Sequence, residues 1–151
     1  DNLNTDQMFA GKHTYNVLST DPVAIMPLLF EDFDPSFSKN VEKEDIIIAG
    51  ENFGCGSSRE HPSVGLSYAG IKVIIVKSVN RIFYRSSINQ GLVLIVHKQA
   101  VEAYESGDQV NINFDNGEIL TGSKRFSFEP LPEKLKQIII KKGLVNFLKT
   151  E

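Results

Sequence analysis

Short apolar runs alternate with segments of helical periodicity through the middle of the chain. The runs are rich in β-branched residues and are typical of buried strands; they lie at 45–50 (DIIIAG), 72–78 (KVIIVKS) and 92–96 (LVLIV). Between them, 58–70 and 79–91 have the pattern of helices, each ended by a glycine. This order of strand, helix, strand, helix, strand predicts βαβ crossovers and parallel strands.

The flanking segments carry other patterns. Residues 22–30 predict a short helix broken at a proline, and residues 98–107 predict another helix. Apolar and polar residues alternate through 109–120 up to an Asn-Gly pair, which predicts a β-hairpin. Residues 132–140 are amphipathic at helical spacing. We therefore expect an α/β fold: a single compact domain over 1–151 with a mixed sheet.

Composition narrows the class of protein. A chain of 151 residues with 41% hydrophobic and 23% charged residues can bury a globular core. The net charge of −3 argues against a nucleic-acid partner, and the apolar runs are too short to span a membrane. The single cysteine, Cys55, excludes an internal disulfide and a self-contained thiolate-ligated cluster, and it favours a reducing, cytoplasmic location. The first residue is not Met, so we expect a few native N-terminal residues to be missing.

Reactive side chains are densest in the stretch ENFGCGSSREHP at 51–62. The stretch follows a predicted strand and precedes a helix that we expect to begin near Ser57 or Ser58. Helix N-termini offer unpaired N–H groups and partial positive charge, and two glycines allow a ligand to approach the backbone. The guanidinium of Arg59 is a planar, two-pronged donor that matches a carboxylate. The pattern therefore predicts a site for an anion, with a carboxylate as the preferred ligand.

Other interpretations of the same stretch are weaker. A phosphate loop needs a lysine after its second glycine, and a serine stands there instead. The G-x-S-x-G elbow of serine hydrolases is absent, although Ser57 and His61 lie one helical turn apart, so a hydrolase stays open. A metal site would need more ligands than Cys55 and His61. Each residue alone could also cap a helix or lie at the surface, so residue chemistry by itself indicates only an anion site.

The string GCGSSREH, followed by VNRIFYRSSINQGLVLI, resembles the small subunits of the 3-isopropylmalate dehydratase family. Those subunits match the swivelling domain of the aconitase superfamily, which implies a β/β/α arrangement here. The likeness includes DNLNTDQM near the start and GLVNFLK near the end, so it covers essentially the whole chain. It implies a hydro-lyase that interconverts 2-isopropylmalate and 3-isopropylmalate in leucine biosynthesis. It also implies a separate large subunit that supplies the [4Fe-4S] cluster, without which this chain is inactive.

The resemblance also assigns roles to four residues. The family's proton-abstracting serine falls on Ser57, and the following serine, which hydrogen-bonds the substrate, falls on Ser58. The arginine that grips a substrate carboxylate falls on Arg59, and the aspartate that faces the active site falls on Asp6. A helix N-terminus and a neighbouring guanidinium would both favour the alkoxide form of Ser57.

The resemblance places the family's specificity loop at residues 13–22. Relatives that accept a third carboxylate tend to place an arginine in it, whereas this chain has Val17 and Leu18 there and no Lys or Arg between Lys12 and Lys39. An aliphatic surface suits an isopropyl group and leaves a buried carboxylate unpaired. We therefore expect an isopropylmalate-type substrate. Homoaconitate, a methylmalate analogue and a non-catalytic, anion-binding regulatory module remain the alternatives.

Three further residues have no assigned chemistry. His61 belongs to the conspicuous string, and we expect it to form a hydrogen bond at the start of the helix. Arg81 and Arg85 lie one turn apart on the second predicted helix, where we expect a solvated or salt-bridged face, with a part in the anion site or in a subunit contact as the alternatives.

Overall fold

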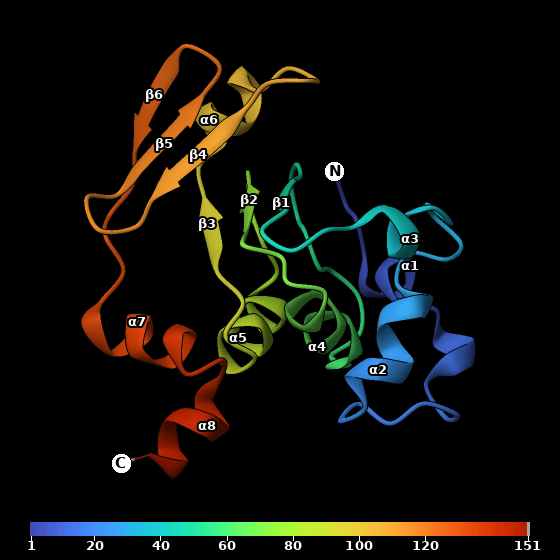
Figure 1. Cartoon of the computed structure of the whole chain (residues 1–151). Coiled ribbons are helices and arrows are strands. Elements are labelled where there is room, and N and C mark those ends of the chain that lie inside the picture. Colours follow the sequence, from blue (N-terminus) through green and yellow to red (C-terminus); the bar gives the residue numbers. More distant parts are fainter. Residues whose placement is uncertain (151) are drawn as a thin grey trace.

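Three parallel strands and two crossover helices form the centre of the molecule, for which a computed structural model describes residues 1–150 (Figure 1). The strands are β1 (Ile46–Ile48), β2 (Val73–Val76) and β3 (Leu94–Val96), in the order β1-β2-β3. The crossovers run through α4 (His61–Tyr68) and α5 (Arg81–Asn89). Alternation of apolar runs and helical segments therefore predicted this part of the fold correctly.

A second, antiparallel sheet follows the parallel one. It consists of β4 (Val110–Asn113), β5 (Glu118–Thr121) and β6 (Lys124–Ser127), in that order. The predicted hairpin is confirmed as β4 and β5, with a turn over 114–117. The α/β class is confirmed, but parallel and antiparallel strands do not share the one mixed sheet that we expected. The hairpin packs its apolar side on a face of the parallel sheet, where it removes apolar side chains from water.

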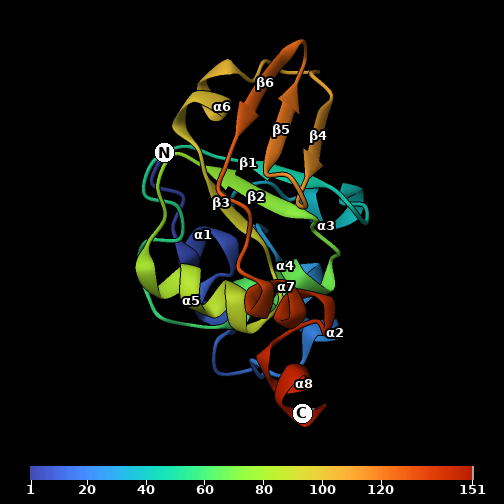
Figure 2. The same cartoon turned by 90° about the vertical axis from the view of Figure 1, so that its left-hand side faces the viewer.

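The two faces of the parallel sheet bury two separate cores. Side chains alternate along β2, so Ile74 and Val76 point to one face and Val73 and Ile75 to the other. The first face packs on the helical side, including α4 and α5. The second packs on the antiparallel sheet, where Ile119 is fully buried, and on α6. The molecule thus has three layers, antiparallel sheet, parallel sheet and helices, in agreement with the expected β/β/α arrangement (Figure 2).

Short helices complete the two flanks. They are α1 (Thr5–Met8), η1 (Gly11–His13), α2 (Pro22–Ile25), η2 (Met26–Leu28), α3 (Phe37–Asn40), α6 (Lys98–Ala103), α7 (Glu133–Ile140) and α8 (Leu144–Lys149). The helix predicted at 22–30 is confirmed as α2, which passes into the tighter turn η2 at its proline. In α7, Ile138 is buried and Lys134 is exposed, as expected for an amphipathic helix. Across residues 1–150, every helix is too short or too polar to cross a membrane.

Candidate active site

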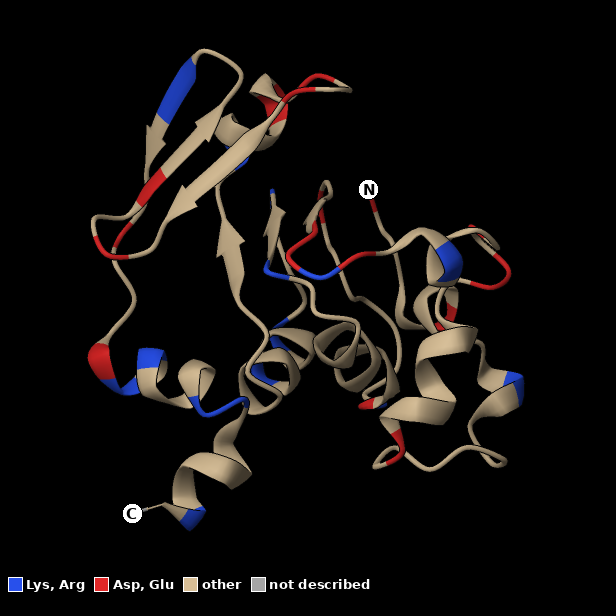
Figure 3. Cartoon of the chain, in the orientation of Figure 1, with Lys and Arg blue, Asp and Glu red and all other residues tan. Residues whose placement is uncertain are grey.

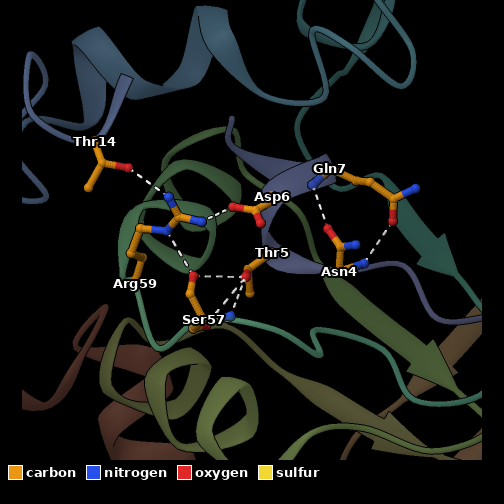
Figure 4. A network of polar contacts seen from close by, with 7 residues as sticks. All are labelled: Asn4, Thr5, Asp6, Gln7, Thr14, Ser57 and Arg59. Atoms are coloured by element: carbon orange, nitrogen blue, oxygen red, sulfur yellow. Dashed lines mark hydrogen bonds and ion pairs between the residues drawn. The ribbon is translucent and has the colours of Figure 1, made fainter. Parts of the chain in front are cut away.

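Two stretches about fifty residues apart in sequence lie side by side and form the site. The backbone N–H of Thr5 donates to the carbonyl of Cys55 at 2.9 Å, and that of Gly54 donates to the carbonyl of Leu3 at 2.8 Å. These bonds align the N-terminal segment with the loop that follows β1. As a result, α1 places Asp6 beside the Ser-Ser-Arg segment (Figure 4).

The helix after this loop begins later than its sequence suggested. We expected it to begin near Ser57 or Ser58, but α4 begins at His61. Pro62 has no N–H to donate back to residue 58, so it belongs in the first turn of a helix and a start near Ser58 would leave a gap in the bonding. Ser57 therefore does not lie at a helix N-terminus, and the expected contribution of the helix dipole to its alkoxide is wrong.

Two side chains hold Ser57 in place. Arg59 donates from Nε to Ser57 Oγ at 2.8 Å, so a guanidinium charge directly contacts the oxygen that would carry negative charge. Thr5, fully buried, accepts from the Ser57 backbone N–H at 3.0 Å and lies 3.1 Å from Ser57 Oγ. A Cβ at position 56 would lie 3.0 Å from Thr5 Oγ1, so Gly56 leaves room for this hydroxyl.

Arg59 is the hub of the polar network. Besides Ser57, it donates from one terminal nitrogen to Thr14 Oγ1 at 2.8 Å and pairs through the other with the carboxylate of Asp6 (Figure 4). A guanidinium has five N–H donors, and these three partners use three of them. Two donors remain, one on each terminal nitrogen, which is the number that a carboxylate takes in a two-pronged contact.

The remaining predicted site residues lie around this hub. Ser58 is exposed, and its hydroxyl has no hydrogen-bond partner among residues 1–150. In the loop that Thr14 attaches to Arg59, Val17 is half-buried against the helical core, whereas Leu18 is 74% exposed. The structure thus brings Asp6 and Ser57 to Arg59 and leaves Leu18 as the larger free apolar surface of the loop.

Sequence reasoning missed two contributors, Thr5 and Thr14. Thr5 directly precedes Asp6 in the Thr-Asp pair that the resemblance pointed to, so its position was a usable signal. Thr14 lies in a loop with no distinguishing pattern, and only the fold reveals that it accepts from Arg59.

His61 forms the hydrogen bond expected of it, although with a partner distant in sequence. Its Nε2 donates to the carbonyl of Val17 at 2.8 Å, and its Nδ1 is buried without a partner within the described chain. Ser57 Oγ instead contacts Thr5 and Arg59. The serine–histidine pair that a hydrolase would need is therefore not formed.

A charged cluster anchors the start of the loop. Glu31 contacts Lys12 Nζ at 2.8 Å and His13 Nε2 at 2.9 Å. The hydrogen bond from Lys12, and then that from His13, lowers the pKa of Glu31 below its usual value, and the same contact raises the pKa of Lys12. The cluster joins η1 to the segment after η2, and it lies outside the contacts of Ser57.

Metal-binding chemistry is not concentrated at this site. Between Asp1 and Thr150, no three or more His, Cys, Asp or Glu side chains form a group that could hold a metal ion. Cys55 is half-buried, and its Sγ lies 3.7 Å from the carbonyl oxygen of Asn2. Arg81 and Arg85 are exposed on α5, in agreement with a solvated face.

Comparison with known proteins gives one consistent family. Residues 5–100 match the aconitase C-terminal domain. The chain is 41% identical to the 3-isopropylmalate dehydratase small subunit of Aliarcobacter butzleri, over 99% of this chain and 89% of that protein. It is 40% identical to small subunit 1 of the same enzyme from Archaeoglobus fulgidus, over 99% of this chain and 92% of that protein.

A solved structure agrees with the sequence relatives. The crystal structure of 3-isopropylmalate dehydratase from Methanocaldococcus jannaschii superimposes with a TM-score of 0.84 at 38% identity, over 97% of this chain and 86% of that one. Similarity of this extent covers both sheets and the helical layer. The chain therefore belongs to the aconitase C-terminal domain family and, within it, to the 3-isopropylmalate dehydratase small subunits.

Proposed function

We propose that this chain is the substrate-gripping small subunit of a 3-isopropylmalate dehydratase, a hydro-lyase that interconverts 2-isopropylmalate and 3-isopropylmalate in leucine biosynthesis. Family membership supports the reaction class. The observation that carries the assignment of the site is the contact of Arg59 with both Ser57 and Asp6. Through these contacts, one short segment presents both a proton acceptor, Ser57, and a guanidinium that can bind a substrate carboxylate, Arg59.

Each residue has a distinct part in the proposed mechanism. Ser57 Oγ, as an alkoxide, takes the proton from the substrate carbon next to a carboxylate, and Arg59 stabilises the negative charge on that oxygen. The two free donors of Arg59 bind a substrate carboxylate. Asp6 holds the guanidinium in position, and Ser58 donates a hydrogen bond to the substrate.

The other half of the reaction belongs to a partner. We assign the [4Fe-4S] cluster to a separate large subunit, where it would act as a Lewis acid toward the substrate hydroxyl. The grip and the proton acceptor of this chain are insufficient alone, because hydroxide is a poor leaving group without such help. We therefore expect the chain to be active only when that subunit covers the face that carries Arg59.

Substrate choice follows from the loop at 13–22. Between Lys12 and Lys39 the chain carries acidic residues but no Lys or Arg, and His13 contacts Glu31, so a third substrate carboxylate would find no Lys or Arg in this segment to pair with (Figure 3). Leu18 offers an exposed apolar side chain instead. Isopropylmalate is therefore the proposed substrate, ahead of homoaconitate, and a methylmalate analogue would fill the apolar surface less completely.

Reconstitution tests the proposal directly. The chain would be mixed with a cluster-loaded large subunit, and isopropylmalate turnover measured for the pair and for each chain alone. We expect turnover only from the pair, and Ser57→Ala should reduce it roughly 10²–10⁴-fold, the range for loss of a proton-transfer group. Ser127→Ala, on the distant strand β6, is the matched control and should leave the rate unchanged.

Three results would contradict the proposal. Activity of the isolated chain would contradict the assignment of the cluster to a separate large subunit. A preference for homoaconitate over isopropylmalate would overturn the substrate. Failure of a large iron–sulfur subunit to copurify with the chain, together with no turnover from any mixture, would favour the anion-binding regulatory module.

A further inference from the structure

The loop at 13–22 is attached to the active-site segment at two points. Arg59 donates to Thr14 Oγ1, and His61 Nε2 donates to the Val17 carbonyl, each at 2.8 Å and each across more than forty residues of sequence. Arg59 and His61 are two positions apart. One short segment therefore carries the carboxylate grip and also determines where the loop lies relative to it.

His61 is itself held rigidly. It is the first residue of α4 and only 6% exposed, and its ring stacks on that of Phe9 at 4.7 Å with an interplanar angle of 11°. A carbonyl oxygen only accepts, so the bond to Val17 places the ring proton on Nε2. The other ring nitrogen is buried and unpaired in the described structure. Its bond to the loop is therefore the one hydrogen bond of this imidazole.

The loop has little regular structure to hold its own shape. From His13 to Leu18 the hydrogen bonds between backbone groups are all of turn type, such as that from the Val17 N–H to the His13 carbonyl at 3.0 Å. Tyr15 and Leu18 are 97% and 74% exposed. Leu18 directly follows the carbonyl that His61 binds, so that bond restrains the backbone from which the Leu18 side chain projects.

We propose that His61 is a positioning residue for substrate discrimination. By holding the Val17 carbonyl it fixes Leu18 where the aliphatic branch of the substrate lies, while Arg59 binds the carboxylate. The inference rests on the proposed function, because it assigns a role within that site. It gives His61 no part in proton transfer, since its Nε2 is occupied and Ser57 Oγ contacts other groups.

The test measures discrimination rather than rate. For the reconstituted pair, kcat/KM would be determined for 3-isopropylmalate and for 3-methylmalate, and the ratio of the two values compared among variants. The ratio does not depend on the fraction of folded enzyme. His61→Phe keeps a stacking ring without a donor, and we expect it to lower the ratio about fivefold, as for loss of one neutral hydrogen bond. His61→Gln, which restores an N–H, should recover most of the ratio.

A second histidine provides the matched control. His97 Nε2 also contacts a backbone carbonyl, that of Ser127 at 3.1 Å, but it does so at the antiparallel sheet. His97→Phe should leave the ratio unchanged. An unchanged ratio in an active His61→Phe pair would overturn the inference. Absence of isopropylmalate turnover in the unmodified pair would instead overturn the proposed function.

A measurement on the unmodified chain keeps the inference testable if His61→Phe does not fold. The ¹⁵N resonances of a histidine distinguish a proton on Nε2 from one on Nδ1. We expect the His61 proton on Nε2. A neutral ring with its proton on Nδ1 would overturn the inference, because Nε2 could then not donate to Val17.

Discussion

The two sides of the parallel sheet are held together in different ways. On the helical side, single side chains bridge distant segments, as Thr5 does to Ser57 and His61 to Val17. On the other side, β4, β5 and β6 pair with their sequence neighbours in a regular ladder. The comparison shows a division of labour, because individual contacts position chemistry on one side and repeated contacts provide stability on the other.

Arg59→Lys, on the helical side, should have the largest effect on turnover and little effect on stability. Lysine keeps the charge but cannot reproduce contacts to Ser57, Thr14 and Asp6 together with a two-pronged grip. Loss of even one charge-assisted bond of about 1.5–3 kcal/mol predicts a fall in kcat/KM of the reconstituted pair of roughly 10- to 150-fold. The melting temperature should stay close to that of the unmodified chain. Near-normal turnover would place the active site elsewhere.

Ile119→Ala is the converse change, on the antiparallel side. Ile119 is buried between the two sheets, so its truncation leaves a cavity and should lower the free energy of unfolding by about 2–5 kcal/mol. Denaturant titration would measure this loss. Turnover per folded subunit should be unchanged. Val96→Ala, at a position 52% exposed on β3, is the control and should cost far less.

Thr5→Val tests whether a single hydroxyl on the helical side positions Ser57 for turnover. Valine has a similar shape but no hydroxyl, so the Ser57 backbone N–H loses its partner and Ser57 Oγ loses a neighbour. A net loss of about 1 kcal/mol per hydrogen bond predicts a fall in kcat of roughly five- to tenfold with little change in KM. Thr5→Ser should restore the rate. A loss of rate in Thr5→Ser with none in Thr5→Val would show that the methyl group, rather than the hydroxyl, matters.

Glu31→Gln should have the smallest effect, and a pH-dependent one. The contacts of Lys12 and His13 lower the pKa of Glu31, so its carboxylate stabilises the folded chain above its unfolded pKa of about 4.3. That contribution is lost as the pH falls through the lowered pKa. The variant should therefore melt slightly below the unmodified chain at pH 7, and the gap should close in acid. Glu129→Gln, at an exposed position, is the control and should show no such gap.

Local pattern was sufficient for part of the fold. The three parallel strands, α4, α5 and the hairpin were predicted because apolar spacing reports burial within a short window. The strand β6 was missed, since Lys-Arg-Phe-Ser carries one apolar residue at an exposed edge. Whether the hairpin joins the parallel sheet or stacks on it depends on tertiary packing, which no local window contains.

The residues of the candidate site stay a prediction, and the contacts among them were not predicted. The resemblance indicated Asp6, Ser57 and Arg59, and the structure brings these three together. The late start of α4 was missed, because Pro62 has no N–H to donate back to residue 58 and so belongs in the first turn of a helix, a signal that the apolar pattern outweighed. The partners Thr5 and Thr14 were missed because their bonds join residues 45 or more positions apart.

The compactness of the Ser-Arg-His segment has a consequence for handedness. Under the proposed roles, the segment provides a proton acceptor at Ser57 and a planar cation at Arg59, and its His61 positions the apolar side chain of Leu18. Three unlike contacts in fixed places are the minimum that can tell a molecule from its mirror image. Loosening any one of them would leave this segment with two such contacts, so recognition of chirality would then depend on contacts outside it.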